Sequence, residues 1–229
     1  MCFSAEASFS AAAVLVPVGL YALSKARRDM PGWTLFAAFP LVFGVQQALE
    51  GVVWIGLGSG DTELTYCAAR GYLFFSHFFW PAFVPLAAWW LEPEATRRRA
   101  MALFAVLGFL FGLATYLPNV LESFELEVGF LQNSITYQTR LLHDSLISRS
   151  VVEVLYALII LPPLMLSSEY RIRIFGGLVL LALVATYAAF YHALISVWCF
   201  LAAALSLYLV FAMQSALGAR RADPPGEVS

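Results

Sequence analysis

The stretch RRRAMALFAVLGFLFGLATYL, residues 97–117, decides the class of this protein. Three arginines precede residues 100–117, which contain no charged side chain. An uncharged apolar helix of this length can cross the hydrocarbon core of a bilayer. Basic residues gather at the cytoplasmic ends of such helices. The stretch therefore predicts a membrane-spanning helix that begins at the cytoplasmic side.

The same pattern, an apolar run bounded by short charged segments, recurs along the chain. Hydrophobic residues make up 61% of the 229 residues and charged residues 12%, against about 45–50% and about 25% in soluble domains. This composition excludes a disordered chain, a nucleic-acid-binding protein and a disulfide-stapled secreted module. Seven spans of about 20 residues would use roughly 140 residues. We expect an all-α polytopic membrane helix bundle with seven transmembrane helices, at about 5–24, 33–57, 67–91, 100–117, 151–166, 174–190 and 193–213.

The basic residues predict how the bundle is oriented. Ten of the thirteen Lys and Arg residues fall in one set of loops: Lys25, Arg27, Arg28, Arg97, Arg98, Arg99, Arg171, Arg173, Arg220 and Arg221. Because loops rich in Lys and Arg stay in the cytoplasm, the N-terminus is expected outside and the C-terminus inside. The expected location is the inner membrane of a bacterial cell, as a multi-pass protein. Residues 1–217 would form the transmembrane domain and residues 218–229 a polar cytoplasmic tail.

One outer connection, residues 118–149, is long for a bundle of this kind. Apolar residues alternate at Leu126, Val128 and Phe130, and again at Ile135 and Tyr137. The segment between them, 132–134, has the composition of a turn. This pattern predicts a small hairpin or lid over the outer mouth of the bundle. The alternative is an irregular loop.

Polar side chains lie inside the expected spans, where an ionisable group costs roughly 2.5–3.5 kcal/mol. Gln46, Gln47 and Glu50 share one helical face, which Trp54 extends. Glu50 is expected roughly 10 Å below the outer surface and His77 roughly 15 Å below it. Since both groups occupy one depth band, we predict that Glu50 and His77 meet in a polar site. The alternative for the two glutamines is hydrogen bonding between helices.

Other groups with reactive or ligating side chains fall at the same outer end. His192 lies between the last two spans, Cys2 precedes the first, and Cys199 lies about two turns into the last. Cys2 could act as a nucleophile, ligate a metal, or form a disulfide with Cys67 on the outer side. His143 and Asp144 lie in the outer loop, where solvation is the default. Glu153 forms an i, i+4 pair with Arg149, for which a structural role is favoured.

Two motifs resemble an uncharacterised group of bacterial multi-pass membrane proteins. They are Met1-Cys2-Phe3-Ser4-Ala5, continued by Ala7-Ser8-Phe9, and Gln46-Gln47-x-x-Glu50-Gly51-x-x-Trp54; Trp198-Cys199-Phe200 is similar to the last span of that group. The resemblance covers nearly the whole chain. It implies a small integral membrane protein with no established activity, and it adds weight to Cys2, Gln46, Gln47, Glu50 and Trp54.

A more distant similarity of architecture is to the seven-span zinc hydrolases that include alkaline ceramidases and adiponectin receptors. That superfamily uses three histidines, an acidic residue and a serine at one end of the bundle. This chain has three histidines, and Ser76 precedes His77. It lacks the superfamily's last-span pair of histidines four residues apart, since Ser196 stands four residues after His192.

Three functions follow as hypotheses. The first is a metal-dependent hydrolase of a lipid-like substrate, with zinc as the candidate metal. Its metal ligands would be His77, His192 and Glu50, with Cys2 or His143 completing the site. Glu50 or Cys2 would be the catalytic group. The second is a non-enzymatic protein that binds a small ligand or cofactor through Gln46, Gln47, Glu50 and Trp54. The third is a proton-coupled transporter that uses Glu50 and His77 as a relay.

Overall fold

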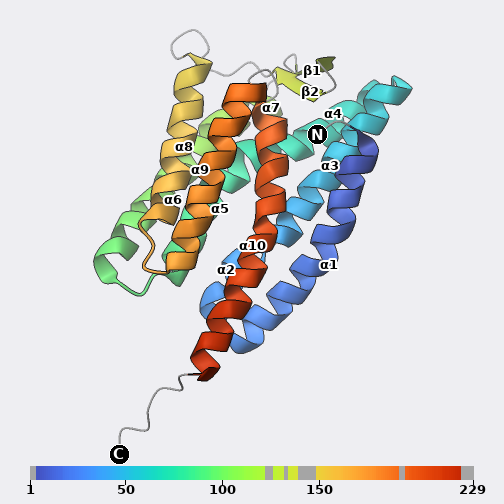
Figure 1. Cartoon of the computed structure of the whole chain (residues 1–229). Helices are drawn as coiled ribbons and strands as arrows, with labels where there is room; N and C mark the ends of the chain where they lie inside the picture. The colour runs from blue at the N-terminus through green and yellow to red at the C-terminus, as the bar shows by residue number, and fades with distance from the viewer. Residues whose placement is uncertain (1–3, 122–125, 132–133, 139–147, 191–193, 223–229) are drawn as a thin grey trace, which may run out of the picture.

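The computed structural model describes residues 4–121, 126–131, 134–138, 148–190 and 194–222, and almost all of them are helical (Figure 1). The α-helices are α1 (Ala5–Asp29), α2 (Thr34–Ala37), α3 (Phe39–Ser59), α4 (Thr62–Leu73), α5 (Trp80–Leu91), α6 (Ala95–Tyr116), α7 (Pro118–Leu121), α8 (Arg149–Met165), α9 (Tyr170–Phe190) and α10 (Leu194–Ala222). A 3-10 turn, η1 (Pro31–Trp33), precedes α2, and a π-helical turn, η2 (Phe74–Phe79), links α4 to α5. Two strands, β1 (Glu127–Leu131) and β2 (Ser134–Gln138), complete the described structure.

Each of the seven ranges expected to cross the membrane is helical. Within the described residues, five helical stretches are long and apolar enough to do so: Ala5–Asp29, Pro31–Ser59, Ala95–Val120, Tyr170–Ala189 and Leu194–Arg220. The fifth expected range forms α8, which has 17 residues, and the third is divided among α4, η2 and α5. The prediction of a helical protein of membrane type is therefore confirmed.

Two helix ends differ from the expected ranges. Helix α1 continues to Asp29 and includes the basic residues that were placed in a loop. Helix α8 does not break at Pro162–Pro163 but runs through both and ends at Met165. The carbonyl of Pro162 still accepts the amide of Leu166 at 2.8 Å, so the prolines cost hydrogen bonds only to the preceding turn.

Small residues bring neighbouring helices into close contact. Helices α1 and α3 run antiparallel, with Gly19 against Leu41 at one end and Gly51 against Phe9 at the other. A methyl group at Gly19 would overlap the backbone of Leu41. Helices in membranes associate through such close packing, because lipid tails are as apolar as the helix surface and the hydrophobic effect contributes little to helix association.

The outer connection contains the predicted hairpin. Strands β1 and β2 pair antiparallel, with Val128 opposite Tyr137 and Gly129 opposite Thr136. Ile135 and Tyr137 are buried, and the ring of Tyr137 stacks on Tyr72 of α4 with centroids 5.0 Å apart. Figure 1 shows the hairpin at the end of the bundle where α8 begins, opposite the C-terminal end of α10. The hairpin prediction is confirmed.

The π-helical turn η2 follows from a proline and a threonine. Pro81 has no amide hydrogen to donate to the carbonyl of His77, four residues before it. That carbonyl instead accepts the hydroxyl of Thr115 on α6 at 3.1 Å. The amide of Trp80 bonds the carbonyl of Phe75, five residues back. Single π turns inside α-helices are frequent at functional sites.

Candidate ligand-binding site

The turn η2 places Ser76 and His77 on the wall of an interhelical pocket. The pocket has a volume of about 570 Å³, including its opening to solvent, between η2 and helices α6, α8, α9 and α10. Its apolar and aromatic lining residues are Phe111, Val152, Tyr156, Leu183, Leu194, Ile195 and Trp198, and its polar ones are Ser76, His77, Thr115, Glu153 and Cys199. We call it the outer pocket, because Glu153 lies on the first turns of α8, at the hairpin end of the bundle.

Two ionisable side chains of opposite type face this pocket from different helices. The Nδ1 atom of His77 lies 2.9 Å from the hydroxyl of Ser76. Glu153 is half-buried, and Arg149, one turn before it on α8, is exposed. An imidazole and a carboxylate in a mostly apolar wall can hold one polar group of a ligand.

A second pocket continues from the outer one. It has a volume of about 410 Å³, including its opening to solvent, and shares Tyr156, Trp198 and Cys199 with the outer pocket. Its other lining residues are apolar or aromatic: Phe39, Phe43, Trp80, Val84, Ile160, Leu164, Phe175, Val179 and Ala202. We call it the inner pocket.

An aromatic pair stands between the two pockets. Tyr156 and Trp198 meet edge to face, with ring centroids 5.4 Å apart and planes at 69°. The indole Nε1 of Trp198 is buried and makes no hydrogen bond within the described part of the chain. A buried donor of this kind is costly unless a partner satisfies it.

The polar face of α3 lies in the core beside the pockets. Gln46, Gln47 and Glu50 are all fully buried. The indole of Trp80 donates to Oε1 of Gln46 at 2.7 Å, and the hydroxyl of Ser196 donates to Oε1 of Glu50 at 2.5 Å. These bonds fasten α3 to α5 and α10, so they join three helices through side chains that the sequence had marked as a site.

Glu50 and His77 have different hydrogen-bond partners, and their predicted shared site stays a prediction. Glu50 bonds Ser196 on α10, whereas His77 bonds Ser76 and lines the outer pocket. Cys199 lies beside Gln46 and Glu50 and also reaches both pockets. Trp54 is half-buried and packs against the cluster that includes Cys199.

Several residues predicted for the site lie outside the described residues. They are Cys2, His143 and His192. Cys67 is exposed on α4, and its predicted disulfide with Cys2 stays a prediction. Among the residues that the structure describes, no group of three or more His, Cys, Asp or Glu side chains is arranged to hold a metal ion. The zinc hypothesis therefore stays a prediction, which the metal content of the purified protein would test.

Sequence reasoning missed Tyr156, which lines both pockets. Glu153 was expected at the outer end, with a structural ion pair favoured, and Trp198 was noted in a motif of the last span. One signal was present: Glu153 and Tyr156 are three residues apart, which places them on the same face of α8. The contact of Tyr156 with Trp198 depends on how α8 packs against α10, and the sequence carries no mark of it.

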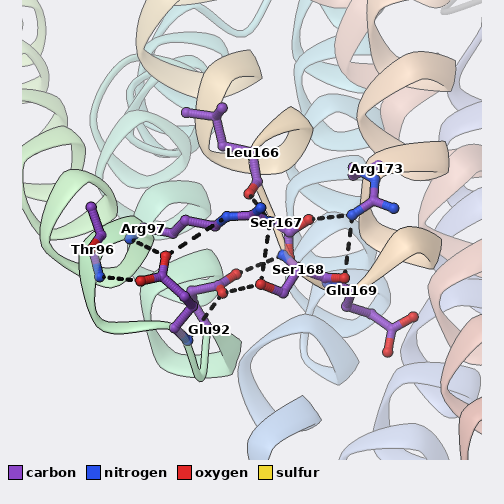
Figure 2. A network of polar contacts seen from close by, with 9 residues as sticks. Glu92, Thr96, Arg97, Leu166, Ser167, Ser168, Glu169 and Arg173 are labelled. Carbon is purple, nitrogen blue, oxygen red and sulfur yellow. Dashed lines mark hydrogen bonds and ion pairs between the residues drawn. The ribbon is translucent and has the colours of Figure 1, made fainter.

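A second polar network lies at the opposite end of the bundle (Figure 2). Glu92, which follows α5, is buried and accepts both the amide and the hydroxyl of Ser168, which precedes α9. The guanidinium of Arg97 donates to the carbonyl of Leu166, and that of Arg173 to the carbonyl of Ser167 at 2.8 Å. We call this network the loop clamp, since it joins the α5–α6 connection to the α8–α9 connection.

A comparison with protein families matches residues 1–224 to a family described only as "Family of unknown function (DUF6629)". The match agrees with the uncharacterised family that the sequence motifs indicated. No curated protein matches the chain. No solved structure matches it either.

Proposed function

We propose that this chain, which belongs to the family of unknown function DUF6629, is a multi-pass membrane protein that binds a small amphipathic ligand in its outer pocket. The pocket itself carries the proposal. Its wall is mostly apolar, and it holds one carboxylate, Glu153, and one imidazole, His77, from separate helices. Ligand pockets combine an apolar lining with a few placed polar groups in this way.

The charge of the wall selects the headgroup. Glu153 presents a carboxylate to the pocket, and the exposed Arg149 is the cation one turn before it on the same helix. A hydrogen bond to a charged partner is roughly twice as strong as a neutral one. We propose that the ligand is an amphiphile with a positively charged amine, which can donate a charge-assisted hydrogen bond to Glu153 inside the pocket.

The membrane arrangement in this proposal has seven spans, with the N-terminus outside and the C-terminus in the cytoplasm. The five long apolar helices support a multi-pass protein. The two remaining spans of this arrangement, the third and the fifth along the chain, are the combined α4–η2–α5 segment and α8. The distribution of basic residues supports the orientation and placement in a bacterial inner membrane. With this orientation the outer pocket faces the side away from the cytoplasm.

Photo-crosslinking tests the proposal on the full chain in lipid nanodiscs. A short alkylamine with a diazirine next to its amine should form adducts with outer-pocket residues such as Val152, Leu183 and Ile195. Glu153→Gln should lower that labelling about tenfold, because the charge-assisted bond is lost. Glu63→Gln, which changes an exposed carboxylate on α4, is the matched control and should leave it unchanged. Labelling confined to lipid-facing residues, or indifferent to Glu153→Gln, would refute the proposal.

A further inference from the structure

The lining of the two pockets is continuous along two helices. On α8 the outer pocket is lined by Glu153 and Tyr156, and the inner pocket by Tyr156, Ile160 and Leu164. These residues are three or four apart, so they form one stripe on one face of the helix. The two pockets therefore follow one another along one face of α8, and we call this succession the path.

Helix α10 repeats the pattern on the facing side. Ile195 lines the outer pocket, Trp198 lines both, and Ala202 lines the inner one. Again the spacing is three and four. The stripe on α10 faces the stripe on α8 at Tyr156 and Trp198, so this aromatic pair lies between the two pockets.

The dimensions of the path match one lipid chain. From Glu153 to Leu164 the rise along α8 is about 16 Å. One leaflet of a bilayer contributes about half of its hydrocarbon thickness of about 30 Å, which is the reach of a single chain. The inner compartment beyond Tyr156 and Trp198 presents apolar side chains from α3, α5, α8, α9 and α10. This wall can pack against a hydrocarbon chain, and it provides few hydrogen-bonding groups for a polar ligand.

We infer that the ligand is a single-chain, long-chain amine, whose ammonium group lies at Glu153 and whose hydrocarbon chain passes Tyr156 and Trp198 into the inner pocket. This inference rests on the proposed function, because it uses the same headgroup site. Beyond the proposed function, it specifies that the ligand has one long hydrocarbon chain and that this chain lies in the inner pocket. The buried indole of Trp198, which has no partner among the described residues, can donate to an oxygen next to the amine of such a ligand.

Two tetradecylamine probes test the position of the chain, one with a diazirine beside the amine and one with a diazirine at the chain end. Both are added to the full chain in nanodiscs, and the adducts are mapped by mass spectrometry. The head-labelled probe should react with Val152 or Ile195. The tail-labelled probe should react with inner-pocket residues such as Leu164 and Phe175.

A blocking variant separates the two proposals. Ala202→Phe places a ring in the inner pocket and should lower tail-probe labelling there by more than about tenfold, since the chain loses its apolar site. Short-amine labelling of the outer pocket should persist. Ala204→Phe adds the same ring at an exposed position of α10 and is the matched control. Thermal unfolding confirms that each variant folds, and Val179→Phe replaces Ala202→Phe if it does not.

The outcomes are distinct. Tail-probe adducts in the outer pocket, or on lipid-facing residues such as Leu181 and Val184, overturn the long-chain inference and leave the outer site standing. Tail labelling that Ala202→Phe does not change overturns it as well. If neither the short amine nor the head-labelled probe reacts in the outer pocket of the unmodified protein, the proposed function fails together with the inference.

Discussion

Glu50 shows how a buried carboxylate is tolerated in this bundle. Its side chain is fully buried on α3, and the hydroxyl of Ser196 on α10 donates to it at 2.5 Å. A buried acceptor that loses its donor costs about 1–3 kcal/mol. The bond therefore ties the two helices at a point where lipid or water cannot substitute for it.

A double-mutant cycle tests which partner Glu50 has. Ser196→Ala should lower the free energy of unfolding by about 1–3 kcal/mol, because it removes the hydroxyl that donates to Oε1 of Glu50. Combined with Glu50→Gln, it should show a coupling of at least about 0.5 kcal/mol. Glu50→Gln with His77→Ala should be additive, since the two residues have different partners. Thermal unfolding in detergent measures both cycles, with Ser10→Ala on the exposed face of α1 as control. Coupling between Glu50 and His77 would instead restore the site expected from the sequence.

At this scale the sequence indicated which side chains are unusual but not what they contact. Gln46, Gln47 and Glu50 stand out because polar groups inside a span are costly. Their partners Trp80 and Ser196 come from distant parts of the chain. No spacing rule reaches across such separations, so the pairing required the packed structure.

The turn η2 shows how one element depends on another. The carbonyl of His77 is free of its usual donor because Pro81 has no amide hydrogen, and Thr115 on α6 supplies the hydroxyl instead. The expected span 67–91 was continuous, although Pro81 and Pro85 lie within it. Proline alone does not distinguish a kink from a π turn, and the hydroxyl of Thr115 that reaches the carbonyl of His77 comes from another helix.

The substitution Pro81→Ala should therefore offset part of the stability that Thr115→Val removes. Thr115→Val should reduce the free energy of unfolding by about 1–3 kcal/mol, because the carbonyl of His77 loses its donor. Pro81→Ala restores an amide that can reach that carbonyl. The double variant Thr115→Val/Pro81→Ala should thus lose less than the sum of the single losses in a thermal-unfolding cycle. Losses that simply add would show that the hydroxyl of Thr115 does not replace the missing amide.

The carboxylate of Glu94, which caps the start of α6, should make the stability of the protein depend on pH. The backbone amides of Arg97 and Thr96 donate to the carboxylate of Glu94 and hold its pKa below the ordinary value of 4.5. A carboxylate with a lowered folded-state pKa stabilises the protein above that ordinary value, and the contribution is lost as the pH falls through the lower pKa. The melting temperature should therefore fall more steeply below about pH 4.5 in the unmodified protein than in Glu94→Gln. Equal slopes would mean that the cap contributes nothing.

The whole molecule combines a helical bundle, a hairpin at one end and the loop clamp at the other (Figure 1). The seven helical ranges and the hairpin followed from apolar length and alternation, which are local properties of the sequence. The position of the pockets did not follow, because it depends on how η2, α8 and α10 pack together. The basic residues remain the main guide to orientation.

Topology reporters test that orientation. Fusions after Arg99 and after Arg221 should both read as cytoplasmic, because ten of the thirteen Lys and Arg residues lie in the loops of that side. A fusion after Ser59, at the end of α3, should read as external and serves as the opposite control. An external reading for the tail would invert the bundle and move the outer pocket to the cytoplasmic side.

The loop clamp determines how this bundle can move. Glu92 and Ser168 join the ends of α5 and α6 to the ends of α8 and α9. Helices held together at one end can separate only by pivoting about that end. The clamp therefore restrains α5, α6, α8 and α9 at the end of the bundle away from Glu153. Any change in the spacing of these helices is expected to be larger at the Glu153 end, beside the outer pocket.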